Sequence, residues 1–450
     1  VNNVAIVEDM SNMFKGCIKF NQHLNYWKVS NVTNMTSMFE GCIEFNQDVS
    51  SWTMSSVKEM TSMFKSCTAF NNGVTSSTSI PLNWTNFLVP TEMDNMFEGC
   101  KNFNQDVSSW NVSSVIKMNN MFNGCDVFNQ DVSSWVVSNV TNMSNMFNGC
   151  IAFNNGAGNQ LTWNVAHVTN MSNMFNGCSK FNQDVSSWVV AEVTDMSNMF
   201  KGCDIFNQNV SSWDVSKVTN MSNMFNGCSV FNNGGATLTW TLSAFIINMV
   251  NMFNGCDKFN QKIMNKPLLG ADDKWTLPVN KSAMEDMFKG CVDYNQDIHH
   301  WEFNSSILTV EGGIDMFKNA TKMYDRYTTS APCEFVYIKD GLVNIKAKII
   351  SGVLQQLNTC KIVYRGSLPT PIIIANDDKL KRKEPSTTGI ANLNNNAYID
   401  NNDKVEYSCT DNYSLLYNNQ RIAGGDIHTE TCINSKNITL DAKYLSLIHI

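Results

Sequence analysis

The amino-acid sequence predicts a leucine-rich-repeat-like solenoid of about 12 coils of 25 residues, followed by a small all-β carboxy-terminal region. The pair Met-Phe recurs twelve times between Met13 and Met316, most often 25 residues apart. A Cys follows the Met by four residues in eleven of these units, and all eleven Trp residues fall at one position of the repeat. A unit of this size with one apolar side cannot bury that side alone, whereas stacked copies can.

The elements of one coil follow from a clean copy of the unit, residues 181–206. Its first segment, FNQDVSSW, carries β-branched and aromatic residues and predicts a strand, so that stacked coils form a parallel sheet. The segment M-S-N-M-F-N-G-C predicts a single helical turn, with a residue such as Ser144 as its N-cap. The Gly that follows supplies the left-handed residue that ends the turn. At about 4.8 Å per coil, twelve coils predict a rod of about 55–60 Å.

Three lengthened units replace FNQD with FNNG, at Phe70, Phe153 and Phe231. Asn-Gly is a turn signal, so the extra residues are expected to leave the coil as loops at one edge of the rod. Because these units recur every third coil, two interpretations stay open. The loops are either the trace of a duplicated three-unit block or a row of contact sites.

The repeat pattern stops near residue 324, which predicts three parts of the chain. Residues 1–323 form the solenoid, 324–357 a β-rich connector, and 358–450 a β domain. Within the connector, alternating apolar residues at 333–338 and 343–350 predict half-buried strands.

Composition excludes some classes of protein. The net charge is −8 and the charged fraction is 16%, which argues against a nucleic-acid-binding protein, because such proteins are usually basic. No stretch approaches the ~18 apolar residues of a membrane span. The chain begins with Val and opens on no signal-peptide pattern, which indicates a mature product or a fragment.

The repeated cysteines form a ladder along the rod. Equivalent positions in neighbouring coils lie about 4.8 Å apart, within the Cα range of disulfides. However, ladder side chains point the same way, and a free Cys is a well-buried small apolar residue. We therefore expect buried free thiols, with disulfides and a metal site as alternatives. The ladder consists of Cys17, Cys42, Cys67, Cys100, Cys125, Cys150, Cys178, Cys203, Cys228, Cys256 and Cys291.

The repeated Asp position and the motif content of the chain do not require a metal site or an active site. Asp recurs at one strand position and could bind calcium, but a solvated carboxylate is the simpler interpretation, since no Gly-rich calcium motif accompanies it. This position holds Asp48, Asp106, Asp131 and Asp184. The sequence contains no P-loop, dinucleotide fingerprint, HExxH or GxSxG motif. We therefore expect no enzymatic activity and no cofactor.

Fourteen sequons for N-glycosylation occur along the chain. Those in the V-T-N-M-S step are better explained as Asn residues that hydrogen-bond along the ladder. Sequons in or near lengthened units and in the carboxy-terminal region are the glycan candidates, namely Asn83, Asn280, Asn412 and Asn437.

The repeat resembles the BspA-like surface-protein repeat, a 26-residue type that is abundant in mycoplasmas and also seen in protists. Its signature, F-N-Q-D-[IV]-S-x-W-x-V-S-x-V-T-x-M-x-x-M-F, is met almost letter for letter at residues 128–147 and 181–200. The resemblance covers residues 1 to about 323. It implies a leucine-rich-repeat-like solenoid on a cell surface, and it carries no catalytic residues over to this chain.

The carboxy-terminal context VEYSC-TDNYSL, followed by TC at 431–432, resembles a sushi module. The resemblance implies that Cys360, Cys409 and Cys432 are its first three cysteines, in an extracellular setting. Asn412 replaces the expected Gly, and the late Trp and the fourth Cys are missing, so an unclassified β-sandwich is the alternative. Together with Cys333, these cysteines are disulfide candidates if the protein is secreted.

These observations predict a non-enzymatic, extracellular or cell-surface protein with a structural or adhesive role. Residues 1–9 look like the latter half of a coil and not like a cap, so we expect head-to-tail self-association into a filament or surface layer. The alternative is a monomeric receptor or adhesin that binds a protein or glycan through the sheet face and the edge loops. An enzyme carried in residues 324–450 on a repeat stalk is the third hypothesis.

Overall fold

The structure is a computed structural model. It describes residues 6–74, 81–82, 84, 92–158, 160–242, 246, 248–264, 275–276, 281–296, 301–302, 314–323, 336–340, 343–350, 353–356, 381–383, 390–392, 405–408 and 437–440. The chain divides into two compact units. Unit 1 comprises Val1–Gln296 and Met316–Thr321, and unit 2 comprises Asp297–Asp315 and Lys322–Ile450. Unit 2 thus includes Asp297–Asp315, which lie within the predicted solenoid, and the predicted connector and β domain fall in the same unit.

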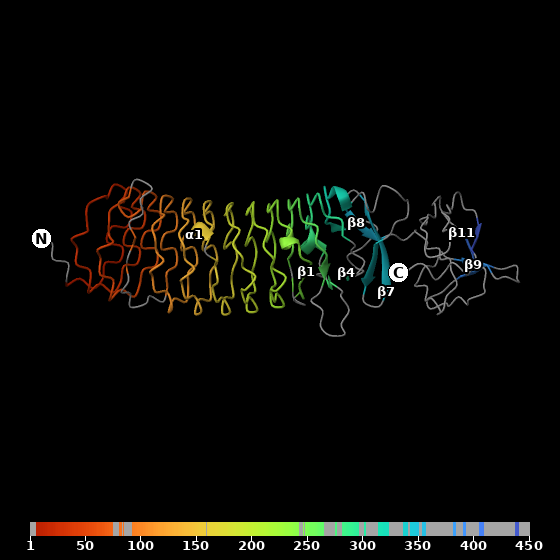
Figure 1. Cartoon of the computed structure of the whole chain (residues 1–450), viewed down its shortest axis with the longest axis horizontal. Coiled ribbons are helices and arrows are strands. Elements are labelled where there is room, and N and C mark those ends of the chain that lie inside the picture. Colours follow the sequence, from red (N-terminus) through yellow and green to blue (C-terminus); the bar gives the residue numbers. More distant parts are fainter. Residues whose placement is uncertain are drawn as a thin grey trace. The chain divides into compact units, whose positions relative to one another are not determined.

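Within unit 1, successive repeats are stacked coil on coil in parallel (Figure 1). A ladder of parallel β-bridges joins equivalent residues of neighbouring coils. It runs through Asp9, Asn34, Glu59, Glu92, Lys117, Asn142, Asn170, Asp195, Asn220 and Asn248. Each coil thus uses the next one to satisfy its backbone, which a single repeat could not do.

The segment M-S-N-M-F-N-G-C carries this backbone ladder, where the sequence predicted a helical turn. In the coil of residues 143–150, every second N–H reaches the next coil: Asn145 N donates to Ser172 O at 2.8 Å, and Phe147 N to Met174 O at 2.9 Å. The intervening N–H groups close tight turns within the coil, as Cys150 N does on Phe147 O.

The backbone conformation explains why no helix forms there. Asn145 has a φ of 55° and Gly149 a φ of 74°, and both residue types tolerate this left-handed region. The same two positions have positive φ in the neighbouring coils. Two left-handed residues, four positions apart in each coil, interrupt the backbone and prevent a continuous α-helix.

The segment FNQDVSSW, predicted as the sheet strand, is bound to its neighbours mainly through side chains. Asn182 N donates to Asn154 Oδ1 at 2.9 Å, and Trp188 Nε1 donates to Leu161 O at 2.8 Å. A backbone strand pair is seen near this position between β1 (Leu238–Thr239) and β2 (Ile263–Met264), which run parallel. Side-chain ladders thus take the place of a long sheet in this part of the described coils.

Other short elements of unit 1 interrupt the coils. α1 (Asn155–Gly158) and η1 (Asn233–Gly235) occupy the Asn-Gly steps of two lengthened units. β3 (Trp275–Thr276) and η2 (Lys281–Met284) follow in the tenth and eleventh units.

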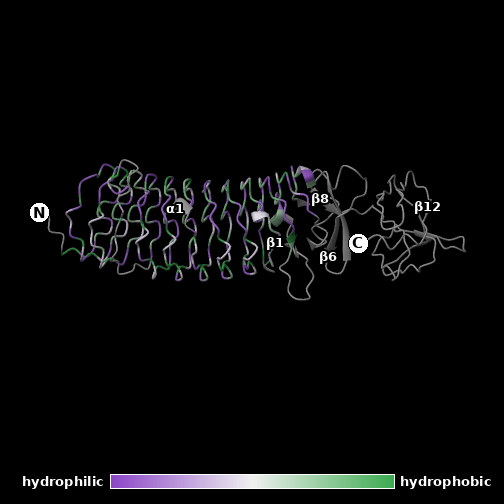
Figure 2. Ribbon diagram, viewed as in Figure 1, coloured by the Kyte–Doolittle hydropathy of each residue, from purple (hydrophilic) through white to green (hydrophobic). Residues whose placement is uncertain are grey.

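The core of unit 1 consists of columns of identical side chains. Two Phe residues of one coil stack on each other, as Phe122 and Phe128 do with ring centroids 4.1 Å apart. Each also stacks on its equivalent in the next coil, with 5.6 Å between Phe122 and Phe147. Figure 2 shows hydrophobic and hydrophilic residues alternating within the coils, which directs the apolar set inward.

Unit 2 contains a mainly antiparallel sheet in the order β4-β6-β7-β8-β5. Its strands are β4 (Trp301–Glu302), β5 (Ile314–Asp315), β6 (Val336–Asp340), β7 (Val343–Ile350) and β8 (Val353–Gln356). β7 coincides with the strand expected at 343–350. Two further antiparallel pairs follow, made by β9 (Lys381–Lys383) with β10 (Ile390–Asn392) and by β11 (Val405–Ser408) with β12 (Asn437–Leu440).

Candidate functional site

The cysteine ladder lies inside unit 1, and its thiols are bound to the preceding coil. The Sγ of Cys178 lies 3.0 Å from Phe147 O, and the same contact recurs from Cys42 to Cys291. Ten of these cysteines are buried and none of the eleven is paired in a disulfide. Cys17, in the first described coil, is exposed, in contrast to the burial expected for the whole ladder.

Burial makes these thiols chemically inert. Desolvation raises the pKa of Cys42 to about 11 and raises the pKa of Cys203 well above its usual value. A thiol acts as a nucleophile or a metal ligand in its thiolate form. These groups are therefore poor nucleophiles and poor metal ligands near neutral pH. No group of three or more His, Cys, Asp or Glu side chains in the described ranges is arranged to hold a metal ion.

A second ladder is built from the Asn that directly follows the Phe of the F-N-Q-D step. Sequence reasoning missed the role of this Asn. Each Asn amide oxygen accepts the backbone N–H of the equivalent Asn in the next coil, as Asn104 Oδ1 does from Asn129 N at 2.9 Å. The adjacent Gln donates to the same oxygen, with Gln130 Nε2 at 2.9 Å. The ladder runs through Asn21, Asn46, Asn71, Asn104, Asn129, Asn154, Asn182, Asn207, Asn232, Asn260 and Asn295.

The lengthened units keep this ladder intact by a different arrangement. Where FNNG replaces FNQD, Gly156 N takes the place of the Gln amide and donates to Asn129 Oδ1 at 3.1 Å. The second Asn, Asn155, is fully buried and accepts from Val132 N at 2.9 Å. The Asn-Gly step therefore has a defined packing function, which explains its recurrence at each lengthened unit without reference to a partner.

The Asp residues of the FNQD step bind their own backbone. Asp131 Oδ1 accepts from Ser133 N at 2.9 Å, and Asp184 Oδ1 from Ser186 N at 2.8 Å. Asp94 differs, because it occupies a Ser/Thr position of the ladder and is 9% exposed. Burial raises its pKa to about 6, although Asn119 N donates to its carboxylate at 3.0 Å.

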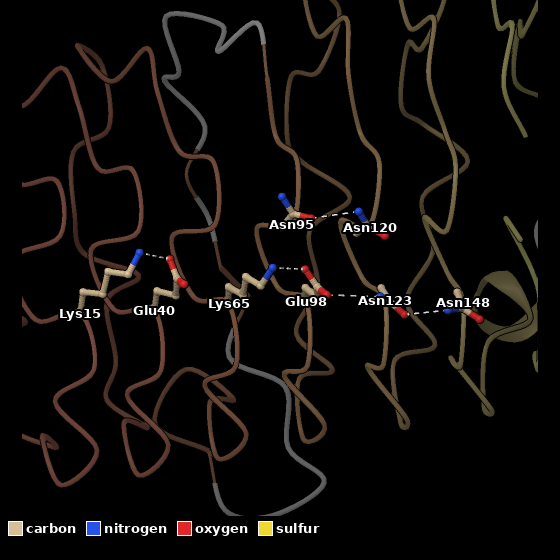
Figure 3. A network of polar contacts seen from close by, with 8 residues as sticks. All are labelled: Lys15, Glu40, Lys65, Asn95, Glu98, Asn120, Asn123 and Asn148. Carbon is tan, nitrogen blue, oxygen red and sulfur yellow. Dashed lines mark hydrogen bonds and ion pairs between the residues drawn. The ribbon is translucent and has the colours of Figure 1, made fainter. Parts of the chain in front are cut away.

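A polar ladder runs along the outside of the first coils (Figure 3). Lys15 pairs with Glu40 at 3.0 Å, and Lys65 with Glu98 at 2.8 Å. Asn123 continues the row beyond Glu98 at 3.5 Å, and Asn148 donates to Asn123 at 3.0 Å. Opposite charges at the same repeat position favour one pairing of neighbouring coils, although half-exposed ion pairs contribute only about 0–1 kcal/mol each.

Exposed aliphatic side chains recur at the two positions after the ladder Cys, where they are between 39% and 52% exposed. They share these positions with polar residues of other coils. The set comprises Ile18, Ile43, Val127, Ile151, Ile205, Val230 and Val292. They give one edge of unit 1 an interrupted apolar character.

Most disulfide and glycan candidates lie outside the described residues. This holds for the disulfide candidates Cys333, Cys360, Cys409 and Cys432, and for the glycan candidates Asn83, Asn280 and Asn412. Asn437 begins β12, where its backbone pairs with Ser408. Among the described residues, no helix has the length and apolarity needed to cross a membrane.

The stack of near-identical coils defines unit 1 as an array of short repeats whose chemistry-bearing side chains serve coil-to-coil bonding. The family described as "Mycoplasma protein of unknown function, DUF285" matches residues 2–87, 81–162, 158–266 and 239–331. The chain therefore belongs to this family, four copies of which span the repeats. No curated protein and no solved structure matches the chain.

Proposed function

We propose that this protein is a non-enzymatic structural or adhesive protein of the cell surface, built as a repeat rod that joins end to end with other chains of its repeat type. Membership of the mycoplasma repeat family supports it. The observation that carries it is the uniform coil-to-coil interface, with the Trp, Cys and Asn ladders repeated from coil to coil. Such an interface is one-dimensional and suits a spacer or fibre.

The bonding of reactive groups supports a non-enzymatic role. Ladder thiols such as Cys203 are buried with raised pKa values, and Asp131 and Asp184 are engaged in turns of their own backbone. Catalysis needs acids, bases or nucleophiles free to meet a substrate. In the described coils the ladder thiols instead contact the preceding coil, and these carboxylates accept from their own turns.

A monomeric receptor or adhesin is the second candidate function. The observation that favours it is the row of exposed aliphatic residues on one edge, because recurring apolar groups on a surface are typical of protein contacts. In this alternative the edge binds a partner protein, and the coils serve only to space the contact residues.

Native material from cells that make the protein tests the proposal. We expect protease added to intact cells to cleave it, and electron microscopy of the released material to show rods joined at their ends. Isolated rods of one chain would favour the receptor. Full protection from protease on intact cells, with cleavage after lysis, would overturn the surface location.

A further inference from the structure

We propose that one edge of unit 1 pairs with the same edge of a second copy of this chain, side by side and antiparallel. The edge consists of the two residues that follow each ladder Cys, and we call it the edge strip. Coils are numbered by their ladder Cys, from coil 1 at Cys17 to coil 11 at Cys291. This lateral contact goes beyond the end-to-end joining proposed above and does not depend on it.

The edge strip is a regular surface, because its own backbone bonds one coil to the next. Ala69 N donates to Ile43 O at 3.1 Å, and Ala152 N donates to Asp126 O at 3.2 Å. Equivalent side chains of neighbouring coils therefore lie about 4.8 Å apart along the strip. Any pattern in their chemistry is presented to a partner at this fixed spacing.

The charges of the edge strip repeat every three coils. Coils 1, 4 and 7 carry a Lys, coils 2, 5 and 8 carry an acidic residue, and coils 3, 6 and 9 carry no charge. Coil 10 holds both signs and coil 11 is acidic. In chain order these charged residues are Lys19, Glu44, Lys101, Asp126, Lys180, Asp204, Asp257, Lys258 and Asp293. The uncharged coils are the lengthened ones, and coils 6 and 9 expose Ile151 and Val230 instead.

The charges in the middle of the strip differ from those nearer its ends. Lys19 pairs with Glu44 at 2.6 Å, and Lys258 pairs with Asp293 at 3.1 Å. Among the described residues, no ion pair includes the side chains of the four charges between these two pairs. The four are Lys101, Asp126, Lys180 and Asp204. Their side chains are therefore open to opposite charges on a partner.

The order of the charges selects an antiparallel second copy as that partner. A strip that runs positive, negative, neutral can be turned end for end and shifted so that every positive coil faces a negative one and every neutral coil faces a neutral one. A parallel copy in register places like charges opposite each other, and a parallel copy shifted by one coil satisfies only the positive coils. Complementary charge fixes the orientation and register of a contact in this way.

The exposed aliphatic residues place the two-fold axis of the pair. With the axis at coil 6, Ile151, which is 52% exposed, packs against Ile151 of the second copy. On either side, Asp126 of one chain then faces Lys180 of the other, and Lys101 faces Asp204. Each of these contacts occurs twice, as a two-fold interface requires. Because the strip is only two residues wide, we expect a weak, salt-sensitive dimer with a total interface below about 1,200 Å².

Charge reversal and its rescue in the full chain test the pairing. Sedimentation equilibrium at about 50 mM salt, with a reducing agent, measures the dimer dissociation constant. We expect Lys101→Glu to raise this constant by about tenfold or more, because it turns attraction into repulsion at two places. Adding Asp204→Lys should restore it. These two residues lie four coils apart in one chain, about 19 Å, so the rescue cannot arise within the chain. Lys58→Glu, at an exposed Lys outside the strip, is the matched control.

A thiol at the axis tests the register. Diamide oxidises two neighbouring thiols to a disulfide and is itself reduced to the hydrazine. We expect Ile151→Cys to form a disulfide between the two copies at position 151, mapped by mass spectrometry, at least about tenfold faster than Val189→Cys forms one at position 189. Val189 is 57% exposed and lies outside the edge strip, so it controls for random collision.

Three results would overturn the proposal. The first is a chain that stays monomeric up to about 300 µM at low salt. The second is a loss of pairing in Lys101→Glu that Asp204→Lys does not restore, and the third is equal cross-linking at positions 151 and 189. Rods joined only at their ends would associate without responding to Lys101→Glu. Such a result would sink the lateral contact and leave the proposed function standing, whereas a protein found inside cells would do the reverse.

Discussion

At the scale of the residue, the burial of Asp94 makes the stability of the fold depend on pH. Its pKa is raised from 3.8 to about 6, because burial disfavours the charged carboxylate. Between about pH 4 and pH 6 the folded chain thus binds more protons than the unfolded chain, so stability falls as pH rises through this window and levels off above it. Asp94→Asn keeps the acceptor for Asn119 N and removes the charge.

We expect Asp94→Asn to raise the free energy of unfolding at pH 7 by about 1 kcal/mol, less than the unscreened value because solvent partly reaches the carboxyl. Denaturant titrations from pH 4 to 7 should show the difference from the unmodified chain growing with pH. Asp184→Asn, on an exposed turn, is the control and should show no change. A difference that shrinks as pH rises would contradict the assignment.

The ladder thiols give a second prediction at this scale. In the native protein, iodoacetamide at pH 8 should modify Cys17, which is exposed, and leave Cys100 and Cys203 unmodified. Burial raises the pKa of both of these thiols, so they offer neither access nor thiolate. Peptide mapping after denaturation should find them reduced and reactive. Recovery of most ladder cysteines as disulfides would refute this.

At the scale of the element, the Asn ladder replaces a strand. Asn129 Oδ1 accepts from both Asn154 N and Gly156 N, so Asn129→Ala leaves two backbone donors without an acceptor. We expect a loss of about 1–3 kcal/mol per donor that water cannot reach. Urea titration followed by circular dichroism measures it, with the exposed Asn102→Ala as the control. Equal stability of the two variants would show that water replaces the amide.

At the scale of the whole molecule, unit 1 is a one-dimensional stack, so damage should be local. Trp188 is 3% exposed and donates to Leu161 O, and Trp188→Ala should destabilise its coil by about 3–5 kcal/mol. Hydrogen exchange should accelerate most in the adjoining coils and fade toward both ends. Trp188→Phe keeps most of the buried ring but removes the donor to Leu161 O, and it should cost about 1–3 kcal/mol. Uniform acceleration along the stack would indicate a single cooperative unit instead.

The period of 25 residues and the inward positions can both be predicted from the sequence. These follow from side-chain chemistry: Trp188, Met199 and Phe200 recur at one spacing because a stacked coil needs an apolar group at the same point in every copy. How the polar backbone between them is satisfied depends on contacts between coils, which the sequence does not reveal. The sequence does not show which hydrogen bond an Asn side-chain oxygen makes. That of Asn170 accepts from Ser172 in its own turn, whereas that of Asn154 accepts from Asn182 in the next coil. The positive φ of Asn145, which turns a predicted helix into an inter-coil ladder, likewise depends on a neighbour that lies one full repeat away in the chain.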